Sequence, residues 1–446
     1  MRALRRGSPQ TQTMTSVNSE ALVEAQYEQF PYPARDPEDE RRRLIGTWLD
    51  HLDILNHHCF RGEYPFRRGF RVLVAGGGTG DGTIFLAHQL RATDAEIIHL
   101  DVSSASIEIA RKRAEIHGFT NIRWVQASLL DLPTLDLGRF DFINCVGVLH
   151  HLVDPEAGLD ALLSALADDG AMAILLYAQY GRTGVYQMQS LLRLVNQGVS
   201  SDGQKIENAR ALLRQLPRTN WFRRGEDLFR EHEAGGDAGL YDLLLHSQDR
   251  AYTVPELYDW LVDRCGLTIQ FSDVHRGRLP YQPETYLANA DPGLLTRIHA
   301  LPQRDQQAIA ELLGGDIVKH CFYLTRNANS QALYGDANFI PLFPSETHQP
   351  SGADLVRIID HHKNRPFLLT HQQSGLQKPM DPGRYTRSIF AHLDGHRSFG
   401  EIFDRVRAEP AYRTEPPSDD ELFANFRPWY EALQSIERLV LRRAEP

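Results

Sequence analysis

Short apolar runs alternate with helical patterns between residue 70 and about residue 180. The runs lie at 70–75, 95–101, 122–128, 140–149 and 170–178, and each has the length of a buried strand. Between two of them, residues 104–118 repeat apolar side chains at helical spacing, starting on serines and ending at Gly118. Strands that alternate with helices pair in parallel through right-handed crossovers. The pattern therefore predicts an α/β fold with a doubly wound, mostly parallel sheet.

The order loosens after residue 180, where two more strand-like runs are embedded in helical segments. Residues at about 181–250 and 281–318 have mixed charges and helical spacing, and we interpret both as helical insertions. The alternating runs 267–274 and 320–326 predict two further strands. An otherwise parallel sheet accommodates such strands as an antiparallel pair at its edge. We therefore expect a sheet of seven strands.

Segments of other types flank this region. Residues 331–446 carry helical patterns and a final strand-like run, which predict a small, mainly helical domain; a winged-helix arrangement is one interpretation. At the other end, residues 1–19 read as a disordered leader and residues 20–69 as a helical cap segment. We expect the α/β domain to occupy residues 70–327.

The cap segment is interrupted by "FPYPARDP", residues 30–37. Three prolines in eight residues rule out regular structure there, because proline lacks the backbone N–H and restricts the residue before it. Such a segment is either a connector or, since it lies shortly before a glycine-rich loop, a cover for a pocket. The sequence leaves both interpretations open.

Composition and charge narrow the class of protein. Hydrophobic residues make up 42% and charged residues 24% of the 446 positions, as in folded globular chains. The formal net charge of -10 argues against nucleic acid as the main partner. The four cysteines are widely spaced, no apolar core of a signal peptide follows the basic N-terminus, and no apolar stretch reaches membrane-spanning length. We therefore expect a cytoplasmic protein.

The glycine-rich stretch "VLVAGGGTGDGT", residues 72–83, follows the first strand. It lacks the GxxxxGK[ST] spacing of a P-loop. A GxGxxG dinucleotide motif would need glycine where Asp81 or Thr83 stands, which argues against a nicotinamide oxidoreductase. What remains is a GxGxG turn, followed by Asp101 at the end of the second strand. Because an acid in that position accepts hydrogen bonds from ribose hydroxyls, the ligand has a ribose and no phosphate requirement. S-adenosylmethionine meets that description.

Four segments in order, "VLVAGGGTG", "LDVS", "ASLLDLP" and "FDFINCVGVLHHL", resemble the motifs of class I S-adenosylmethionine-dependent methyltransferases. The resemblance covers about residues 70–180 and implies a Rossmann-like fold that binds S-adenosyl-L-methionine. It places glycines against the methionine part, an acid and its neighbour at the ribose, and further residues at the adenine and along the pocket. These are Gly76, Gly77, Gly78 and Gly80, then Asp101 and Val102, then Ser128 and Leu129, and finally Cys145 and Val146.

Two positions depart from the family pattern. Val74 stands where the family often has an acid near the amino group of the cofactor, and Ser128 where many members have an aspartate for the adenine. Losing such a polar contact costs about 1 kcal/mol or more unless another group replaces it. Tyr32 and Arg35 of the proline-rich segment are candidates for that replacement, and packing of the connector is the competing interpretation.

Methyl transfer from a sulfonium needs positioning more than acid or base catalysis. His150, with His151 beside it, follows the fourth strand and is a candidate base; Tyr177 follows the fifth strand and is a candidate for the acceptor pocket. Arg182 could pair with an anionic substrate. The polar segment 246–252 is explained either by helix capping or by substrate contact.

Metal binding is not expected. The histidine pairs at 57–58 and 361–362 are adjacent in sequence, so on a helix their side chains point about 100° apart and rarely share an ion. No ligand cluster of metal-binding spacing joins them. We predict that the protein has no metal site.

The sequence thus favours an S-adenosylmethionine-dependent methyltransferase (EC 2.1.1 class) whose acceptor is an unidentified small molecule or protein. The alternative is a non-catalytic protein that binds S-adenosylmethionine or a partner, with the C-terminal domain as the interaction module. That domain carries acidic residues among its arginines and shows no basic stripe, so dimerisation or acceptor presentation explains it better than DNA binding. A homodimer is one expectation.

Overall fold

The computed structural model describes residues 21–229, 231–272, 280–287, 292–344, 351–371 and 376–443. The predicted leader, residues 1–19, lies outside these ranges. The chain divides into two compact units that interleave along the sequence. The first unit comprises Met1–Thr47, Arg67–Leu257 and Gly315–Cys321, and the second comprises Trp48–Phe66, Tyr258–Gly314 and Phe322–Pro446.

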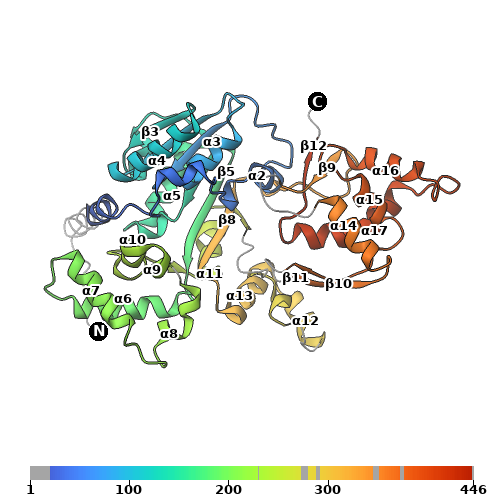
Figure 1. Cartoon of the computed structure of the whole chain (residues 1–446). Helices are drawn as coiled ribbons and strands as arrows, with labels where there is room; N and C mark the ends of the chain where they lie inside the picture. Colours follow the sequence, from blue (N-terminus) through green and yellow to red (C-terminus); the bar gives the residue numbers. More distant parts are fainter. Residues whose placement is uncertain are drawn as a thin grey trace. The chain divides into compact units, whose positions relative to one another are not determined.

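The main sheet has the strand order β3-β2-β1-β4-β5-β8-β7, and the two-residue strand β6 (Ala251–Tyr252) pairs with β5 beside this path (Figure 1). The other strands are β1 (Arg71–Ala75), β2 (Glu96–Asp101), β3 (Ile122–Gln126), β4 (Phe140–Val146), β5 (Leu166–Ala178), β7 (Thr268–Phe271) and β8 (Lys319–Thr325). The pairs among β1 to β5 are parallel, whereas β7 and β8 run antiparallel. The predicted doubly wound sheet of seven strands with a late antiparallel pair is confirmed.

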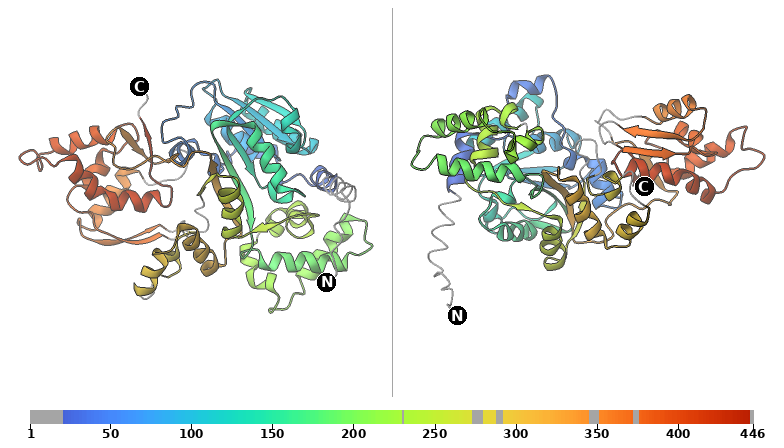
Figure 2. Two further views of the ribbon diagram at one scale, coloured as in Figure 1. Left: turned by 180° about the vertical axis from the view of Figure 1, so that it is seen from behind. Right: turned by 90° about the horizontal axis from the view of Figure 1, so that it is seen from below.

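Strand β1 lies inside the sheet, between β2 and β4, and both of its faces are covered. Val72, Leu73 and Ala75 are completely buried, as the continuous apolar run requires. Helices α3 (Asp81–Gln89) and α4 (Ser104–His117) connect β1 to β2 and β2 to β3, and α5 (Pro155–Ala165) connects β4 to β5. These crossovers run in opposite directions along the sheet. Right-handed crossovers therefore place α5 on the face opposite α3 and α4 (Figures 1 and 2).

Capping residues fix both ends of α4, as the sequence indicates. Ser103 precedes it, and its hydroxyl accepts a hydrogen bond from the Ser106 N–H. Gly118 ends it in the left-handed conformation, with φ 69°. Because β1 pairs in parallel with β2 and with β4, the carboxyl ends of these three strands lie at one edge of the sheet. Open α/β folds bind their ligands at that edge.

A helical insertion follows β5 in the first unit. It contains α6 (Thr183–Val195), α7 (Asp202–Leu213), α8 (Trp221–Gly225), η5 (Glu226–Leu228), α9 (Glu231–Ala234), α10 (Gly236–Leu240) and the π-helical turn η6 (Tyr241–Leu245). Its core joins Val185, Met188, Leu192, Phe222 and Leu244, all nearly inaccessible to solvent. The insertion predicted at about 181–250 is thus helical.

The second unit combines helices with two small sheets. Its helical elements are η2 (Trp48–Asp50), α2 (Leu52–Cys59), η7 (Tyr258–Arg264), η8 (Pro283–Thr285), α12 (Pro292–His299), α13 (Gln303–Gly314), α14 (Gly352–His361), α15 (Thr386–His392), α16 (Phe399–Ala408) and α17 (Asp419–Gln434). Strands β9 (Phe339–Leu342) and β12 (Val440–Arg443) pair, as do β10 (Phe367–His371) and β11 (Leu376–Met380). An aromatic core with Phe390, Phe426 and Trp429 holds α15 against α17.

Residues 21–29 form a helix, and η1 (Pro37–Arg41) follows the irregular proline-rich segment. Short helix α11 (Val254–Leu257) comes after β6. In the described part of the chain, no helix is both long enough and apolar enough to cross a membrane.

Candidate active site

The glycine loop connects β1 to α3, and its conformation demands glycine. Gly76, Gly78 and Gly80 have φ of 76°, 53° and 100°, values that other residues rarely adopt. Space is limiting as well. A Cβ on Gly76 would lie 2.4 Å from a methyl group of Val148, and one on Gly78 would lie 2.7 Å from the carbonyl oxygen of Tyr32. The loop therefore presents backbone without side chains at the carboxyl edge of the sheet.

Gly77 is restricted by its neighbour on β2 rather than by its own φ. A Cβ there would lie 2.3 Å from the imidazole of His99, which bonds to the Thr83 hydroxyl on α3 at 2.8 Å. Burial lowers the pKa of His99 to about 3, so the ring is neutral. The loop thus packs closely on a neutral side chain below it.

Asp101, at the end of β2, is joined directly to the glycine loop. Its Oδ2 accepts from the Gly78 N–H at 2.7 Å and its Oδ1 from the Ser103 N–H at 2.9 Å. Burial raises the pKa of this carboxyl although both hydrogen bonds oppose the rise. A carboxylate has about four acceptor positions, and those that the backbone N–H groups leave unoccupied can take further donors. These residues fit a nucleoside whose ribose carries two hydroxyl groups.

The other residues expected around the cofactor lie near the same edge in different surroundings. Ser128 caps η3 (Leu129–Thr134), where its hydroxyl accepts from the Leu130 N–H at 3.2 Å. Leu129 is buried, and the Val102 carbonyl accepts from Gln126. Cys145 is completely inaccessible, and burial raises the pKa of its thiol to about 12, whereas the next residue of β4, Val146, is partly exposed.

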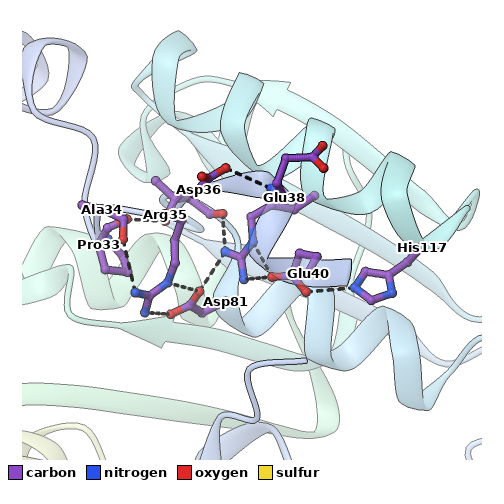
Figure 3. Close-up of polar contacts among 10 residues, drawn as sticks. Pro33, Ala34, Arg35, Asp36, Glu38, Glu40, Asp81 and His117 are labelled. Carbon is purple, nitrogen blue, oxygen red and sulfur yellow. Dashed lines mark hydrogen bonds and ion pairs between the residues drawn. The ribbon is translucent and has the colours of Figure 1, made fainter. Parts of the chain in front are cut away.

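The proline-rich segment packs directly on the glycine loop. The Thr79 hydroxyl donates to the Pro33 carbonyl at 2.7 Å, and the Arg35 guanidinium bonds both oxygens of Asp81, at 2.9 and 2.6 Å (Figure 3). The remaining donor contact of Arg35 goes to its neighbour Ala34. Arg35 therefore anchors the segment to the first turn of α3, which supports the packing interpretation for this residue, and the segment also covers the loop.

A buried arginine extends this anchor. Arg113 on α4 donates to Glu40 at 2.8 Å, to Asp81 at 2.8 Å and to the Thr79 carbonyl at 2.7 Å. Glu40 in turn bonds His117 at 2.8 Å (Figure 3). Burial opposes ionisation of Asp81, but the hydrogen bonds and charges of Arg35 and Arg113 outweigh it and lower the pKa of Asp81. The ion network thereby fixes the covering segment and the loop in one arrangement.

A second group of polar side chains lies at the carboxyl ends of β4 and β5. We call it the polar cluster; its members are Tyr27, His151, Tyr177, Arg182, Asp242 and His246. The Tyr27 hydroxyl donates to Asp242 Oδ1 at 3.1 Å and lies 3.2 Å from His246 Nε2. The Tyr177 hydroxyl donates to Asp242 Oδ2 at 3.4 Å. Asp242 is thus held by phenols from the N-terminal helix and from β5.

Comparison with known proteins decides the family. A family described as "Methyltransferase domain" matches residues 66–216. An uncharacterized protein of Synechococcus sp. is 34% identical over 70% of this chain and 73% of its own length. The ubiquinone/menaquinone biosynthesis C-methyltransferase UbiE of Idiomarina loihiensis is 32% identical, over 25% of this chain and 45% of its own length. The structure of PKMT2 from Rickettsia typhi in complex with AdoHcy has a similar fold, with a TM-score of 0.59 at 12% identity over 91% of this chain and 77% of that one.

The chain belongs to the class I S-adenosylmethionine-dependent methyltransferases. The fold, the cofactor and the enzyme class predicted from the sequence are confirmed. The match to UbiE spans less than half of that relative. The acceptor of this methyltransferase therefore has to be inferred from its own residues.

In the polar cluster of the methyltransferase, Gln248 sets the proton positions of two histidines. Its backbone N–H donates to His246 Nδ1 at 3.0 Å, so the proton of that neutral ring is on Nε2, which faces Tyr27. Its carbonyl lies 3.0 Å from His151 Nδ1, which must donate, leaving the Nε2 lone pair of His151 free to accept. Burial lowers the pKa of His151 to about 4 and that of His246 well below its usual value. Both rings are neutral near pH 7.

The same cluster bears on the prediction that there is no metal site. In the described ranges, His151, Asp242 and His246 offer ligand atoms within 4.8 Å of one another. However, His246 Nε2 carries a proton in this arrangement and has no lone pair for an ion. The hydrogen bonds therefore describe a proton-sharing cluster. His57 and His58 lie elsewhere, in the second unit, where His58 Nε2 is 3.1 Å from Glu437.

The two predicted catalytic candidates have different surroundings. The His150 side chain is completely inaccessible, and its ring packs on Tyr177 with 3.8 Å between centroids. Burial lowers the pKa of His150 well below its usual value, although a hydrogen bond with the Leu175 backbone opposes the shift. Tyr177, by contrast, remains partly exposed. Of the two, only Tyr177 has surface that an acceptor can touch.

Arg182, at the start of α6, carries unused donors. Its guanidinium lies 3.6 Å from the Tyr177 ring centroid and 3.8 Å from Asp249 Oδ2. Its Nε and one terminal nitrogen find no acceptor among the described residues, although only 5% of the residue is exposed. A buried arginine with unsatisfied donors is costly. A ligand oxygen would satisfy it.

Sequence reasoning missed Asp242, Tyr27 and Arg113. Asp242 is a single acid inside the apolar run "LYDLLL". An acid in a segment that is otherwise apolar was the sequence feature that could have indicated a buried, functional carboxylate. Tyr27 gave none, because its partner lies 215 residues away. Arg113 resembles an ordinary solvated position of an amphipathic helix.

Proposed function

We propose that S-adenosylmethionine binds between the glycine loop and Asp101, with Gly76, Gly78 and Gly80 at its methionine part. The support is the glycine backbone of the loop, which has no side chains, together with the acceptor capacity left on Asp101. When bound, the cofactor supplies a methyl group activated by a sulfonium. The residues of the chain bind and orient it; Val102, Ser128, Leu129 and Val146 provide the surroundings of the ribose and adenine, and Cys145 packs behind them.

We propose further that the methyl acceptor is a small molecule that enters at the polar cluster. The observation that carries this proposal is the position of the cluster at the carboxyl ends of β4 and β5, the edge at which the glycine loop and Asp101 also lie. In this arrangement Tyr177 touches the acceptor and His150 supports the Tyr177 ring from below.

The N-terminal helix favours a small acceptor over a protein. Tyr27 bonds Asp242, and the next residue, Glu28, accepts from the Ser103 and Ser104 hydroxyls at 3.0 and 2.6 Å. One helix thus contacts both the cluster and the segment that follows Asp101. A bulky protein substrate would have to displace this helix, whereas a small molecule would not.

Cofactor binding is tested by isothermal titration with S-adenosylhomocysteine. Asp101→Ala should weaken binding at least tenfold, since it removes the acceptors for two hydroxyl groups and frees the Gly78 N–H. The matched control is Asp168→Ala, whose side chain is 89% exposed. Equal affinity of the wild-type protein and Asp101→Ala would contradict the ribose assignment.

The acceptor is sought by incubating the protein with methyl-labelled cofactor and a cell extract divided by size. We expect label in the small-molecule fraction. Label only in protein would support the alternative acceptor class, and cofactor binding without any transfer would support a non-catalytic binding protein whose C-terminal residues, 331–446, recruit a partner.

The setting of the enzyme follows the same reasoning. We propose that it works in the cytoplasm, in line with the free thiols of Cys59, Cys145, Cys265 and Cys321. The net charge of -10 continues to argue against nucleic acid as a partner. Sedimentation analysis would test the expected homodimer.

A further inference from the structure

We propose that the acceptor carries an acidic hydroxyl group, such as a phenol or an enol, and that its proton passes through the Tyr177 hydroxyl to Asp242 while Arg182 binds its oxygen. This inference rests on the proposed function. It names Asp242 as the group that takes the proton, and it names the class of molecule that takes the methyl group at the polar cluster.

The positions of Asp242 and its partners carry the first step. Asp242 lies in the π-helical turn η6, a local irregularity that often marks functional positions. Only 6% of it is exposed, and both of its oxygens accept from tyrosines. Nearby titratable groups from each packed element are Tyr27, Tyr177, His151, Arg182, His246 and Asp249. Burial raises the pKa of Asp242 to about 6, so it is ionised near pH 7 and ready to take a proton.

The two tyrosines have different roles because their oxygens have different partners. The Tyr27 hydroxyl accepts a hydrogen bond from the His246 Nε2–H and donates one to Asp242, so Tyr27 orients the carboxylate as a positioning residue. The Tyr177 oxygen donates to Asp242 at 3.4 Å, leaving its lone pairs free to accept a proton. Both tyrosines are partly exposed, but the Tyr27 oxygen already accepts from His246, so Tyr177 is the member through which a ligand reaches the carboxylate.

Arg182 identifies the kind of atom that loses the proton. Its Nε and one terminal nitrogen are buried without a hydrogen bond to the described residues, Asp249 is 3.8 Å away, and the guanidinium lies over the ring of Tyr177, whose hydroxyl bonds Asp242. Such donors stabilise an oxygen that gains negative charge. They would repel an ammonium group. The combination of a carboxylate acceptor and a guanidinium donor on one tyrosine therefore matches an acidic hydroxyl rather than an amine.

The transfer balances in atoms and charge. The O–H proton of the methyl acceptor moves to the Tyr177 oxygen as the Tyr177 proton moves to Asp242. The electron pair freed on the acceptor oxygen forms the C–O bond to the methyl carbon. The C–S bond breaks at the same time and leaves its electron pair on sulfur. The positive sulfonium and the negative carboxylate both become neutral. In the chain, only Asp242 changes its charge.

The test uses the full-length protein with methyl-labelled S-adenosylmethionine and matched probes: 4-nitrophenol, catechol and 2-naphthol against 4-nitroaniline and benzylamine. We expect methyl transfer to at least one phenol and to neither amine. Asp242→Asn and Tyr177→Phe should lower kcat at least a hundredfold. Asp242→Glu should restore part of it, and Tyr241→Phe, whose hydroxyl bonds Asp202 instead, should leave it unchanged.

Two further readouts separate this role from a structural one. The kcat/KM of the wild type should fall as pH drops below about 6, and Asp242→Asn should lose that limb. Arg182→Met should weaken binding of the phenol probe, measured by titration in the presence of S-adenosylhomocysteine, at least tenfold, without changing the affinity for S-adenosylhomocysteine.

Several outcomes overturn the inference. These are transfer to amines alone, no binding of any phenol, an acidic limb that persists in Asp242→Asn, or a stoichiometric divalent metal that is lost in His246→Ala. In each case S-adenosylhomocysteine still binds. Failure of the proposed function is different, because the wild-type protein would then not bind S-adenosylhomocysteine at all.

Discussion

Replacing Asp242 with asparagine should make the protein more stable at neutral and alkaline pH. The carboxyl has an ordinary pKa of 3.8 and a folded-state pKa of about 6, because burial penalises its charged form. The folded protein therefore holds the proton more tightly than the unfolded chain does. Below about pH 4 Asp242 is protonated in both states and carries no penalty, and between about pH 4 and 6 the penalty grows to its full value.

The size of this effect follows from the two pKa values. A rise from 3.8 to about 6 is about two pK units, and each unit corresponds to about 1.4 kcal/mol, so the ionised carboxylate destabilises the fold by ~3 kcal/mol. An asparagine amide has no such charge, and its oxygen still accepts from the Tyr27 hydroxyl. The free energy of unfolding of Asp242→Asn minus that of the wild type should therefore increase by up to ~3 kcal/mol between about pH 4 and about pH 8.

The assay is urea unfolding of both proteins across that pH range, followed by circular dichroism. All other titrating groups are common to the two proteins, so the difference between their unfolding free energies isolates Asp242. The exposed Asp168→Asn is the control and should show no such trend. Two results would refute the assignment of Asp242 as a buried group whose charged form is penalised. They are a difference in unfolding free energy that stays constant with pH and one that shifts in favour of the wild type as pH rises.

Two further predictions concern the glycine loop. Arg113→Met should lower the free energy of unfolding by about 3–5 kcal/mol, measured by urea titration at neutral pH, because it leaves Glu40 and Asp81 buried without their shared cation. If it costs less than about 1 kcal/mol, the ion network does not hold the loop. Gly78→Ala should weaken S-adenosylhomocysteine binding at least tenfold in a calorimetric titration, because its Cβ would lie 2.7 Å from the Tyr32 carbonyl and its φ of 53° disfavours alanine. Gly118→Ala, with a similar φ of 69° and open space around its Cβ, is the matched control and should bind normally.

The sheet, the glycine loop and the position of Asp101 could be predicted from local sequence. Strands β1 to β5 are continuous apolar runs because both faces of the sheet are covered, and the cap residues of α4 mark its ends. The glycine motif and Asp101 follow from the same local logic, because the ends of neighbouring parallel strands must meet. The domain boundaries predicted from the sequence remain a prediction.

The polar cluster could not be predicted in the same way. Of the predicted catalytic pair, His150 turns out to be completely buried, and the residue that bonds Tyr177 is Asp242, 65 positions away. Nothing in the sequence near Asp242 indicates which tyrosines reach it. The hydrogen-bonding backbone of Gln248, which sets the protons of His151 and His246, is likewise invisible in a list of side chains.

By itself, the sequence determined the order of strands and helices, the conformation of the glycine loop and the acid beside it. These features depend on periodicity, on backbone preference and on chain direction, which are properties of short segments. Only the tertiary structure decided that the proline-rich segment is tied to α3 through Arg35 and that Tyr27 closes the polar cluster. Those features depend on which distant side chains share a buried site, where an unpaired charge or polar group is costly and every neighbour changes its protonation.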